Sequence, residues 1–445
     1  MSALMTLRRA GALAGLSMLL SAAPIASAAG AWHEDPALSG VVSGTIGYGT
    51  WSGRLWGCDR DTNTIWAYDG TTTVSAGALP TYHEATGHGV FTDTGVYLVT
   101  GDYDPSNKGG GTKPLPGIVW SPDGFTDFQP VFSELLINGQ LDWVALPRSL
   151  VDLGGGRLIF TNYCKSPRMY YTGNGGQDWT RLIDLPYWSD WTERIISHFH
   201  GSVYDADHGT LYVMTGDPDK SCTILFCDDL FGTAGLVNDP DSWATRWGLT
   251  DHDRTTLDTD YCLTVGGVAQ SQETRATDIA FCGDWLYWGE DAAREGGMTV
   301  FRAHRTTHTT EVVATGLTGQ VRNVFTTSDG RVFILTAMVT KDGVPRPGHD
   351  EEVHVYEVNA DGSGVTEVAA YDVTNCDPAS AGTCVSTWYG TAEAFDRLWL
   401  CVRDDKTLLP SLDGVSGDLA VILPEPSALL LLGGAGLTLL RRRTG

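Results

Sequence analysis

The chain has 445 residues, of which 42% are hydrophobic, with 54 glycines and 15 tryptophans. This length and composition allow a large buried core and exclude a disordered or fibrous chain. The formal net charge is −25 and the body of the chain carries no basic block, which excludes a protein that binds the phosphate backbone of nucleic acid.

Residues 1–28 have the pattern of a secretory signal peptide. Arg8 and Arg9 precede an apolar stretch from Ala10 to Leu20, and small residues follow up to Ala26-Ser27-Ala28. A positive start, a short apolar segment and an Ala-x-Ala cleavage site are typical of export by Sec-type machinery. The alternative is a buried N-terminal helix. We expect the mature protein to be exported.

Residues 29–420 repeat one pattern seven times. A Gly or Asp, one variable residue and an apolar or aromatic run predict a turn followed by a buried strand. The seven runs begin at Gly53, Gly95, Gly156, Gly209, Gly283, Gly330 and Asp396. A second predicted strand follows each run, beginning at Thr64, Ile118, Met169, Cys222, Met298, Val353 and Asp418.

A mean spacing of roughly 56 residues predicts an all-β chain folded as a single β-propeller. We expect seven four-stranded blades, with six or eight as alternatives. A ring of sheets leaves only short, protected edges. Residues Val41 to Tyr48 are expected to supply the strand that closes the last blade.

One turn has a recognisable motif, formed by Thr172, Asn174, Gly176 and Trp179. It resembles the Asp-box, or BNR repeat, of sialidases and many other propellers, with Asn for Asp. A degraded copy spans Ser121 to Phe128. The resemblance implies a structural turn between the third and fourth strands of a blade, so it indicates fold and not activity.

A basic residue precedes each of five consecutive runs, at an equivalent position in the predicted blade. These five residues are His88, Arg148, His200, Arg275 and Arg322. A ring of fixed cations in an acidic protein predicts a site for an anion, such as an anionic polysaccharide, since arginine suits carboxylates. The alternative is that the arginines pair across blades with the nearby carboxylates Glu84, Asp142, Glu193 and Glu273.

The resemblance to sialidases implies three arginines on a substrate carboxylate. Arg148, Arg275 and Arg322 could take that part, with Tyr389 near the axis. The segment Leu146-Pro147-Arg148 departs from the family's Arg-Ile-Pro segment, and no Asp acid is evident. These departures argue against sialidase chemistry.

Four histidines form a candidate site for a divalent metal ion. They are His83, His88, His198 and His200. Alternation along a strand sends His198 and His200 to one face, as joint ligation of Mn²⁺ or Zn²⁺, or Ca²⁺-assisted chemistry, requires. Some seven-bladed polyuronate lyases have a histidine-rich metal site at this place in the fold, which is an analogy of fold alone. The alternative is a polar lining.

Nine cysteines agree with export into an oxidising compartment. Cys222 and Cys227 lie five residues apart, and Cys376 and Cys384 lie eight apart, so both pairs are candidate disulfides. The odd total leaves at least one thiol free or in an intermolecular bridge. A zinc site is disfavoured because no paired Cys-x-x-Cys occurs.

Residues 421–445 form a candidate sorting tail. Pro424, Glu425 and Pro426 precede an apolar run, and the chain then carries Arg441, Arg442 and Arg443. The tail resembles the PEP-CTERM sorting signal of Gram-negative bacteria. The resemblance implies a single membrane-spanning tail, transient anchoring in the inner membrane, recognition by an exosortase and transfer to the cell surface. A plain membrane anchor is the alternative.

Together these patterns predict an exported surface or matrix propeller that binds an anionic polysaccharide or another surface component. Binding is favoured over catalysis. A carbohydrate-active enzyme, either a polyuronate lyase or a sialidase-like glycosidase, would use the same Arg and His residues. A purely structural surface protein is the third alternative.

Overall fold

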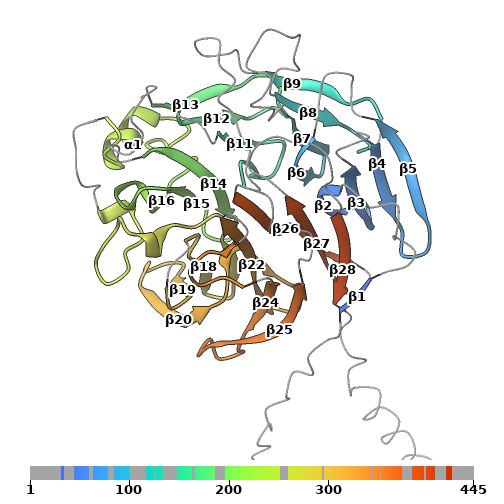
Figure 1. The fold of residues 1–445 in the computed structure, drawn as a ribbon. Helices are drawn as coiled ribbons and strands as arrows, with labels where there is room; N and C mark the ends of the chain where they lie inside the picture. Colours follow the sequence, from blue (N-terminus) through green and yellow to red (C-terminus); the bar gives the residue numbers. More distant parts are fainter. Residues whose placement is uncertain are drawn as a thin grey trace, which may run out of the picture.

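The structure is a computed structural model with strands arranged radially around a centre (Figure 1). It describes residues 32–34, 45–59, 64–78, 85–100, 117–124, 126–133, 148–162, 166–185, 196–250, 259–292, 295–341, 344–350, 352–372, 383–394, 397–405 and 417–422. The described regular structure is almost entirely strand, with one α-helix, α1 (Pro240–Arg246), and 3-10 turns at Asp219–Ser221, Thr259–Tyr261 and Gln272–Thr274. The predicted all-β propeller is confirmed.

Five sheets follow one another along the chain, and each is built from consecutive antiparallel strands. The first is β2 (Thr45–Trp51), β3 (Arg54–Asp59), β4 (Thr64–Tyr68) and β5 (Thr73–Ala78); the second is β6 (Ala85–Thr92), β7 (Gly95–Thr100), β8 (Gly117–Ser121) and β9 (Gln129–Ser133). The third is β10 (Leu150–Asp152), β11 (Leu158–Thr161), β12 (Arg168–Thr172) and β13 (Thr180–Asp184); the fourth is β14 (His198–Asp205), β15 (Thr210–Gly216) and β16 (Thr223–Cys227). The fifth is β17 (Ala280–Cys282), β18 (Trp285–Gly289), β19 (Met298–His304) and β20 (Thr310–Leu317).

The sixth sheet has nine strands, which corrects the expected seven separate blades to six sheets. It joins β21 (Gln320–Thr326), β22 (Val332–Lys341), β23 (Val344–Pro345), β24 (Glu352–Val358) and β25 (Val365–Asp372) to β26 (Thr383–Ala394), β27 (Arg397–Asp405), β28 (Gly417–Ile422) and β1 (Trp32–Glu34). The cause is the length of β22. Its first half pairs with β21 and β24, while Met338 to Lys341 pair with β26.

The ring closes through the start of the chain, but not with the segment expected. Trp32 in β1 lies opposite Ile422 in β28, whereas residues 45–48, expected as the clasp, begin β2 in the first sheet. The first strands of the sheets, together with β26, contact one another around the ring. β26 contacts β2, β2 contacts β6, β6 contacts β10 and β10 contacts β14; β17 contacts β21, and β21 contacts β26. These first strands are therefore the inner strands of the ring.

The seven predicted Gly-and-apolar runs form the second strands β3, β7, β11, β15, β18, β22 and β27. Every residue of β7 and of β15 is buried, because each strand packs between neighbouring sheets. The turn before β15 uses Gly209 at φ +70°, a conformation that residues with a Cβ rarely adopt.

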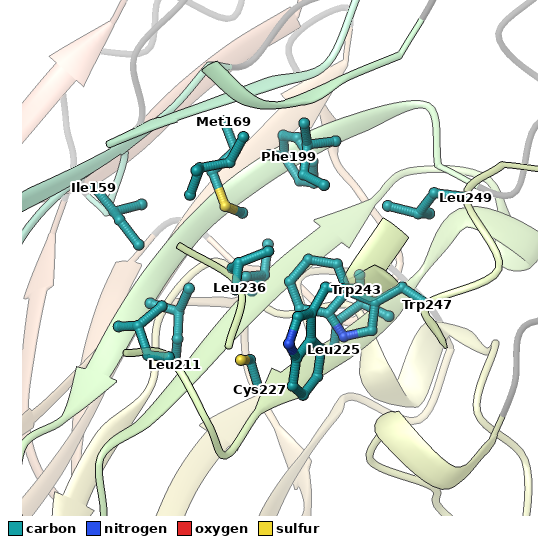
Figure 2. Packing of buried hydrophobic residues seen from close by; sticks show 14 of the residues in the cluster. Ile159, Met169, Phe199, Leu211, Leu225, Cys227, Leu236, Trp243, Trp247 and Leu249 are labelled. Carbon is teal, nitrogen blue, oxygen red and sulfur yellow. The ribbon is translucent and has the colours of Figure 1, made fainter. Parts of the chain in front are cut away.

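A large apolar cluster joins the third and fourth sheets to α1. Met169 of β12 and Phe199, Leu211 and Leu225 of the fourth sheet pack with Trp243 of the helix (Figure 2). Asp239 caps α1 by accepting a hydrogen bond from the Ser242 N–H, and Pro240 occupies the first turn. The cluster fixes β14, which carries the candidate site.

The Asp-box-like turn lies between β12 and β13, as expected, and the degraded copy lies between β8 and β9. Thr172 Oγ1 and the Asp178 N–H donate to Asn174 Oδ1 over 2.9 and 3.0 Å, and Asn174 Nδ2 donates to Asp178 Oδ2 over 3.0 Å. Trp179 Nε1 donates to the Val131 carbonyl over 3.0 Å and ties the third sheet to the second. An Asp at position 174 would place a second carboxylate beside that of Asp178.

Asn174→Ala is expected to lower the free energy of unfolding by about 1–2 kcal/mol, because it removes three partly exposed hydrogen bonds. Asn174→Asp keeps the acceptor but sets a carboxylate against Asp178, so it should also destabilise at pH 7 and recover at acidic pH. Urea unfolding of the two variants measures both effects. A stabilising Asn174→Asp would contradict this account of the turn.

The predicted Cys222–Cys227 disulfide is wrong. Both cysteines are buried free thiols, and β16 between them is extended, which separates their Cα atoms by about 16 Å against the 7 Å limit for a disulfide. Burial raises the pKa of each thiol to about 12, so neither is a reactive thiolate at neutral pH. Cys376 lies outside the described residues, and Cys384 is described only by its backbone in β26.

The predicted signal peptide, residues 1–28, lies outside the described residues. So does the predicted tail, residues 421–445, apart from Val421 and Ile422, which end β28 and therefore belong to the propeller. Among the residues that the structure does describe, there is no helix with the length and apolar character needed to cross a membrane.

Candidate functional site

Strand β14 sets two histidines on one side and a phenylalanine on the other. Phe199 is 1% exposed and packs in the apolar cluster (Figure 2), while the rings of His198 and His200 stack with centroids 5.0 Å apart. Their Nε2 atoms lie 3.1 Å from each other. Both histidines are buried, at 6% and 1% exposure. The alternation expected from the sequence therefore brings these two imidazoles together.

Asp217 completes a cluster with the two histidines. His198 pairs with Gly216 across the β14–β15 hairpin, so the residue after β15 lies beside both rings. Asp217 Oδ2 is 3.3 Å from His198 Nε2, and Oδ1 is 3.3 Å from His200 Nε2. Burial raises the pKa of Asp217, but hydrogen bonds from His198 and His200 outweigh it and hold the pKa well below its usual range. Asp217 is therefore a carboxylate at neutral pH.

Neighbouring groups orient both imidazoles. His200 Nδ1 donates to the Ala276 carbonyl over 2.8 Å, so the neutral form of this imidazole carries its lone pair on Nε2, and only the protonated form donates to Asp217. His198 Nδ1 lies 3.2 Å from Ser197 Oγ, and burial lowers the pKa of His198. A carbonyl or hydroxyl behind each ring is the arrangement that fixes metal-ligating histidines in other proteins.

The donor set fits a divalent transition metal. Two imidazole nitrogens and one carboxylate, all within 4.8 Å of one another, are ligands for Zn²⁺, Fe²⁺ or Mn²⁺. Separations of 3.1 to 3.3 Å match the roughly 3.1–3.4 Å between adjacent ligand atoms at metal bonds of about 2.0–2.2 Å. A trio also leaves coordination positions open for a further ligand.

Two arginines continue the polar network from Asp217. Arg275 NH2 lies 2.6 Å from Asp217 Oδ1 and 3.5 Å from Asp291 Oδ2. Arg322 NH1 lies 3.1 Å from Asp291 Oδ1. The side chains of Arg275, Arg322 and Asp217 are 19%, 27% and 23% exposed, whereas Asp291 is 2% exposed. The arginines and Asp217 can therefore meet a ligand from solvent, and Asp291 holds the arginines from behind.

Arg148 belongs to a different contact. Its Nε donates to Asp278 Oδ1 over 2.5 Å. Asp278 also accepts from the backbone N–H groups of Ile279 and Val324, over 2.8 and 3.0 Å. Gly201 has φ +143°, and a Cβ there would lie 2.6 Å from the Arg148 Cβ, so only glycine lets Arg148 approach β14. Asp278 thus connects the segment just before β10 with the start of β17 and with β21.

The structure brings part of the predicted site together. Of the three arginines, Arg275 and Arg322 share Asp291, while Arg148 pairs with Asp278. Arginine–carboxylate pairing, the alternative interpretation, is present in the described contacts, through Asp217, Asp278 and Asp291. Of the four carboxylates expected as partners, Glu273 is described and accepts a hydrogen bond from Ser271 Oγ. The remaining predicted residues are not tested: His83, Glu84, Asp142 and Glu193 lie outside the described residues, and the side chains of His88 and Tyr389 are not described.

Sequence reasoning missed Asp217, Asp278 and Asp291. A signal existed for Asp217, because the turn between the predicted strands of this hairpin places residue 217 near residue 198. Asp278 and Asp291 acquire their partners only through contacts between sheets, for which the sequence has no local pattern. A second group, Asp350, Glu352 and His354, was also not predicted. Its His354 is bonded to Asp350 and Glu367 at 3.0 and 3.2 Å, which indicates internal pairing.

Gly216→Ala tests the packing around His200. A Cβ on Gly216 would overlap Cε1 and Nε2 of the His200 ring, so the ring must move from its present position. We expect Mn²⁺ affinity to fall by about 10–100-fold, as for losses of groups that orient ligands, measured by calorimetric titration. Unchanged affinity in a variant that melts like the wild type would mean that His200 is not a ligand.

Comparisons with known proteins bear on the fold. No protein-family model matches the chain, and no curated protein matches it. An oligogalacturonate lyase in complex with manganese matches with TM-score 0.50 and 9% identity, over 86% of this chain and 90% of that one. Virginiamycin B lyase from Staphylococcus aureus, in a catalytically inactive form with quinupristin, matches with TM-score 0.47 and 10% identity, over 87% of this chain and 98% of that one.

The extracellular domain of a hybrid two-component system from B. thetaiotaomicron matches with TM-score 0.45 and 12% identity over 87% of this chain, which spans only 39% of that domain. Identities this low show a β-propeller fold and no activity. The resemblances to the PEP-CTERM and Asp-box families stay predictions.

Proposed function

We propose that the protein binds an acidic polysaccharide at the inner strands of the propeller, through a divalent metal ion at His198, His200 and Asp217 and through Arg275 and Arg322. One observation carries this proposal. Two imidazoles, a carboxylate, a guanidinium, a second carboxylate and a second guanidinium follow one another in an unbroken series of contacts of 3.5 Å or less.

Each part of the series suits the carboxylate groups of an acidic sugar. A bound metal supplies a Lewis-acid centre that takes an oxygen ligand. The planar fork of Arg275 or Arg322 can hold a carboxylate by two parallel hydrogen bonds. His200, fixed by the Ala276 carbonyl, keeps its Nε2 directed at the cluster.

A second candidate is a polyuronate lyase that uses the same residues. The fold likeness to an oligogalacturonate lyase that contains manganese, which extends over 86% of this chain, favours it. In both functions the ligand is an acidic polysaccharide, and turnover is what separates them. A glycosidase of the sialidase type has less support, because Arg148 binds Asp278 and not the carboxylate shared by Arg275 and Arg322.

We further propose that this binding takes place outside the cell. The candidate signal peptide at residues 1–28 and the tail with Pro424, Glu425, Pro426 and Arg441 to Arg443 support export, transient anchoring and exosortase-dependent sorting. Mass spectrometry of the protein from its host determines whether residues 1–28 and the part of the tail after Ile422 are removed. A purely structural surface protein would need neither the metal nor the arginines.

The test uses the full chain, stripped of metal with a chelator. Titration with Mn²⁺ and Zn²⁺ is expected to show one site per chain, and a panel of oligosaccharides is expected to bind only where uronate residues are present. The same panel, followed for new unsaturated products, tests the lyase. If no metal binds and no acidic oligosaccharide raises the melting temperature, the proposed function is wrong.

A further inference from the structure

We propose that Arg275 couples the metal to the anion: it balances Asp217 while the metal is absent, and it becomes available to the anion when a metal takes that carboxylate. This inference rests on the proposed function, because it assumes the metal at His198, His200 and Asp217. It adds an order of events, in which the metal binds first and creates the affinity for the anionic ligand.

The contacts of Asp217 place two cations in competition. The carboxylate faces His198 and His200 at 3.3 Å and Arg275 at 2.6 Å. A divalent ion between the imidazoles would share the same carboxylate with the guanidinium. Because both are positive, each weakens the hold of the other on Asp217.

Binding of a divalent metal ion adds net positive charge to the four charged side chains of the site. Arg275 and Arg322 carry two positive charges, and Asp217 and Asp291 carry two negative ones, so with neutral imidazoles the group has no formal charge. A divalent ion leaves it with two excess positive charges in a largely buried setting. That excess attracts carboxylates and is relieved by them.

Arg275 is placed to respond. Its NH2 already lies between Asp217 and Asp291, at 2.6 and 3.5 Å, and its NH1 lies 3.4 Å from Gln272 Oε1. A small movement away from Asp217 keeps the contact with Asp291 and turns the fork toward solvent. By linkage, an anion that binds Arg275 must raise metal affinity by the same factor as the metal raises anion affinity.

Arg275→Gln separates this role from a structural one, because it is expected to raise the affinity for Mn²⁺ and to weaken the effect of the anion on that affinity. Without anion, the variant is expected to bind Mn²⁺ about 5–10-fold more tightly than the wild type, since a competing cation is gone. A galacturonate trimer is expected to raise the Mn²⁺ affinity of the wild type by about 10-fold and that of the variant by a smaller factor, because the metal and Arg322 still meet the anion. Calorimetry with Mn²⁺ alone, and then with the trimer present, measures both.

Two further variants complete the test. Arg275→Lys keeps the charge but lacks the planar fork, so the trimer is expected to raise its Mn²⁺ affinity by less than it raises that of the wild type, and this variant keeps the test if the glutamine variant does not fold. Arg302→Gln is the matched control, since Arg302 of β19 is paired with Glu311 of β20, and its Mn²⁺ affinity should not change. Weaker Mn²⁺ binding by Arg275→Gln overturns the coupling and leaves the metal site standing, whereas no Mn²⁺ binding by the wild type overturns both proposals.

Discussion

His200→Ala is expected to weaken Mn²⁺ binding by about 100-fold or more. The reason is that His200 contributes one of three ligand atoms, while loss of a merely orienting group already costs about 10–100-fold in other metal sites. Binding of uronate oligosaccharides should fall with it, because the excess positive charge that attracts them would be lost. Calorimetric titration of the metal-free protein measures the first effect, and the oligosaccharide panel measures the second.

His304→Ala is the matched control. In the described contacts its Nδ1 accepts from the Thr306 and Thr307 N–H groups and its ring packs on Trp285 of β18, so its metal affinity should equal that of the wild type. If His200→Ala keeps wild-type affinity for both Mn²⁺ and Zn²⁺, the site at His198, His200 and Asp217 is not a metal centre. Any binding of an anion by Arg275 and Arg322 would then have to occur without a metal ion.

Asp205→Asn is expected to lower the free energy of unfolding at pH 7 by about 3–5 kcal/mol, the usual cost of breaking a buried ion pair on one side. The side chain of Asp205 is 0% exposed and that of Arg305 is 8% exposed. Arg305 Nε donates to Asp205 Oδ2 over 2.6 Å, and its NH2 also contacts Asp205 Oδ1. The pair joins β14 to the turn after β19, so the variant leaves a buried guanidinium between two sheets. Urea unfolding gives the value.

The effect has a defined pH dependence. Burial raises the pKa of Asp205, but hydrogen bonds and charge from Arg305 outweigh it, so the folded pKa is lowered. The contribution is therefore present above the unfolded pKa of about 3.9 and is lost as pH falls through the folded value. The difference between wild type and Asp205→Asn should shrink below about pH 4. Asp207→Asn, at a carboxylate that is 79% exposed and also bound to Arg305, should cost at most about 1 kcal/mol, and an equal loss in both variants would contradict the argument.

Sequence patterns predicted most strands, because the turn and the apolar run that define each strand lie in consecutive residues. An apolar run after Gly209 or Gly95 has to be buried on both faces, and β15 and β7 are. The number of sheets depends on which strands pair at a distance. Nothing near Met338 indicates that the end of β22 continues into a pairing with β26, so the sixth sheet could not be predicted from local pattern.

In the candidate site, too, the local features could be predicted and the contacts between sheets could not. His198 and His200 lie two residues apart on one strand, and this period alone predicts that they meet. Asp291 reaches Arg275 and Arg322 only because the segment after β18 lies against the segment before β17 and against β21 itself. The arginines were identified by position, but their partners depend on contacts between sheets.

The pairing of β1 with β28 also determines the order in which the molecule can fold. Each of the first five sheets uses consecutive strands, so it can form from a local stretch of chain as soon as that stretch is available. The last sheet needs Trp32–Glu34 from one end and Gly417–Ile422 from the other, and bringing them together pays the loop-closure entropy of nearly the whole chain. Ring closure is therefore the final step of folding, and until it occurs the edge of β28 stays unpaired and open to association with other chains.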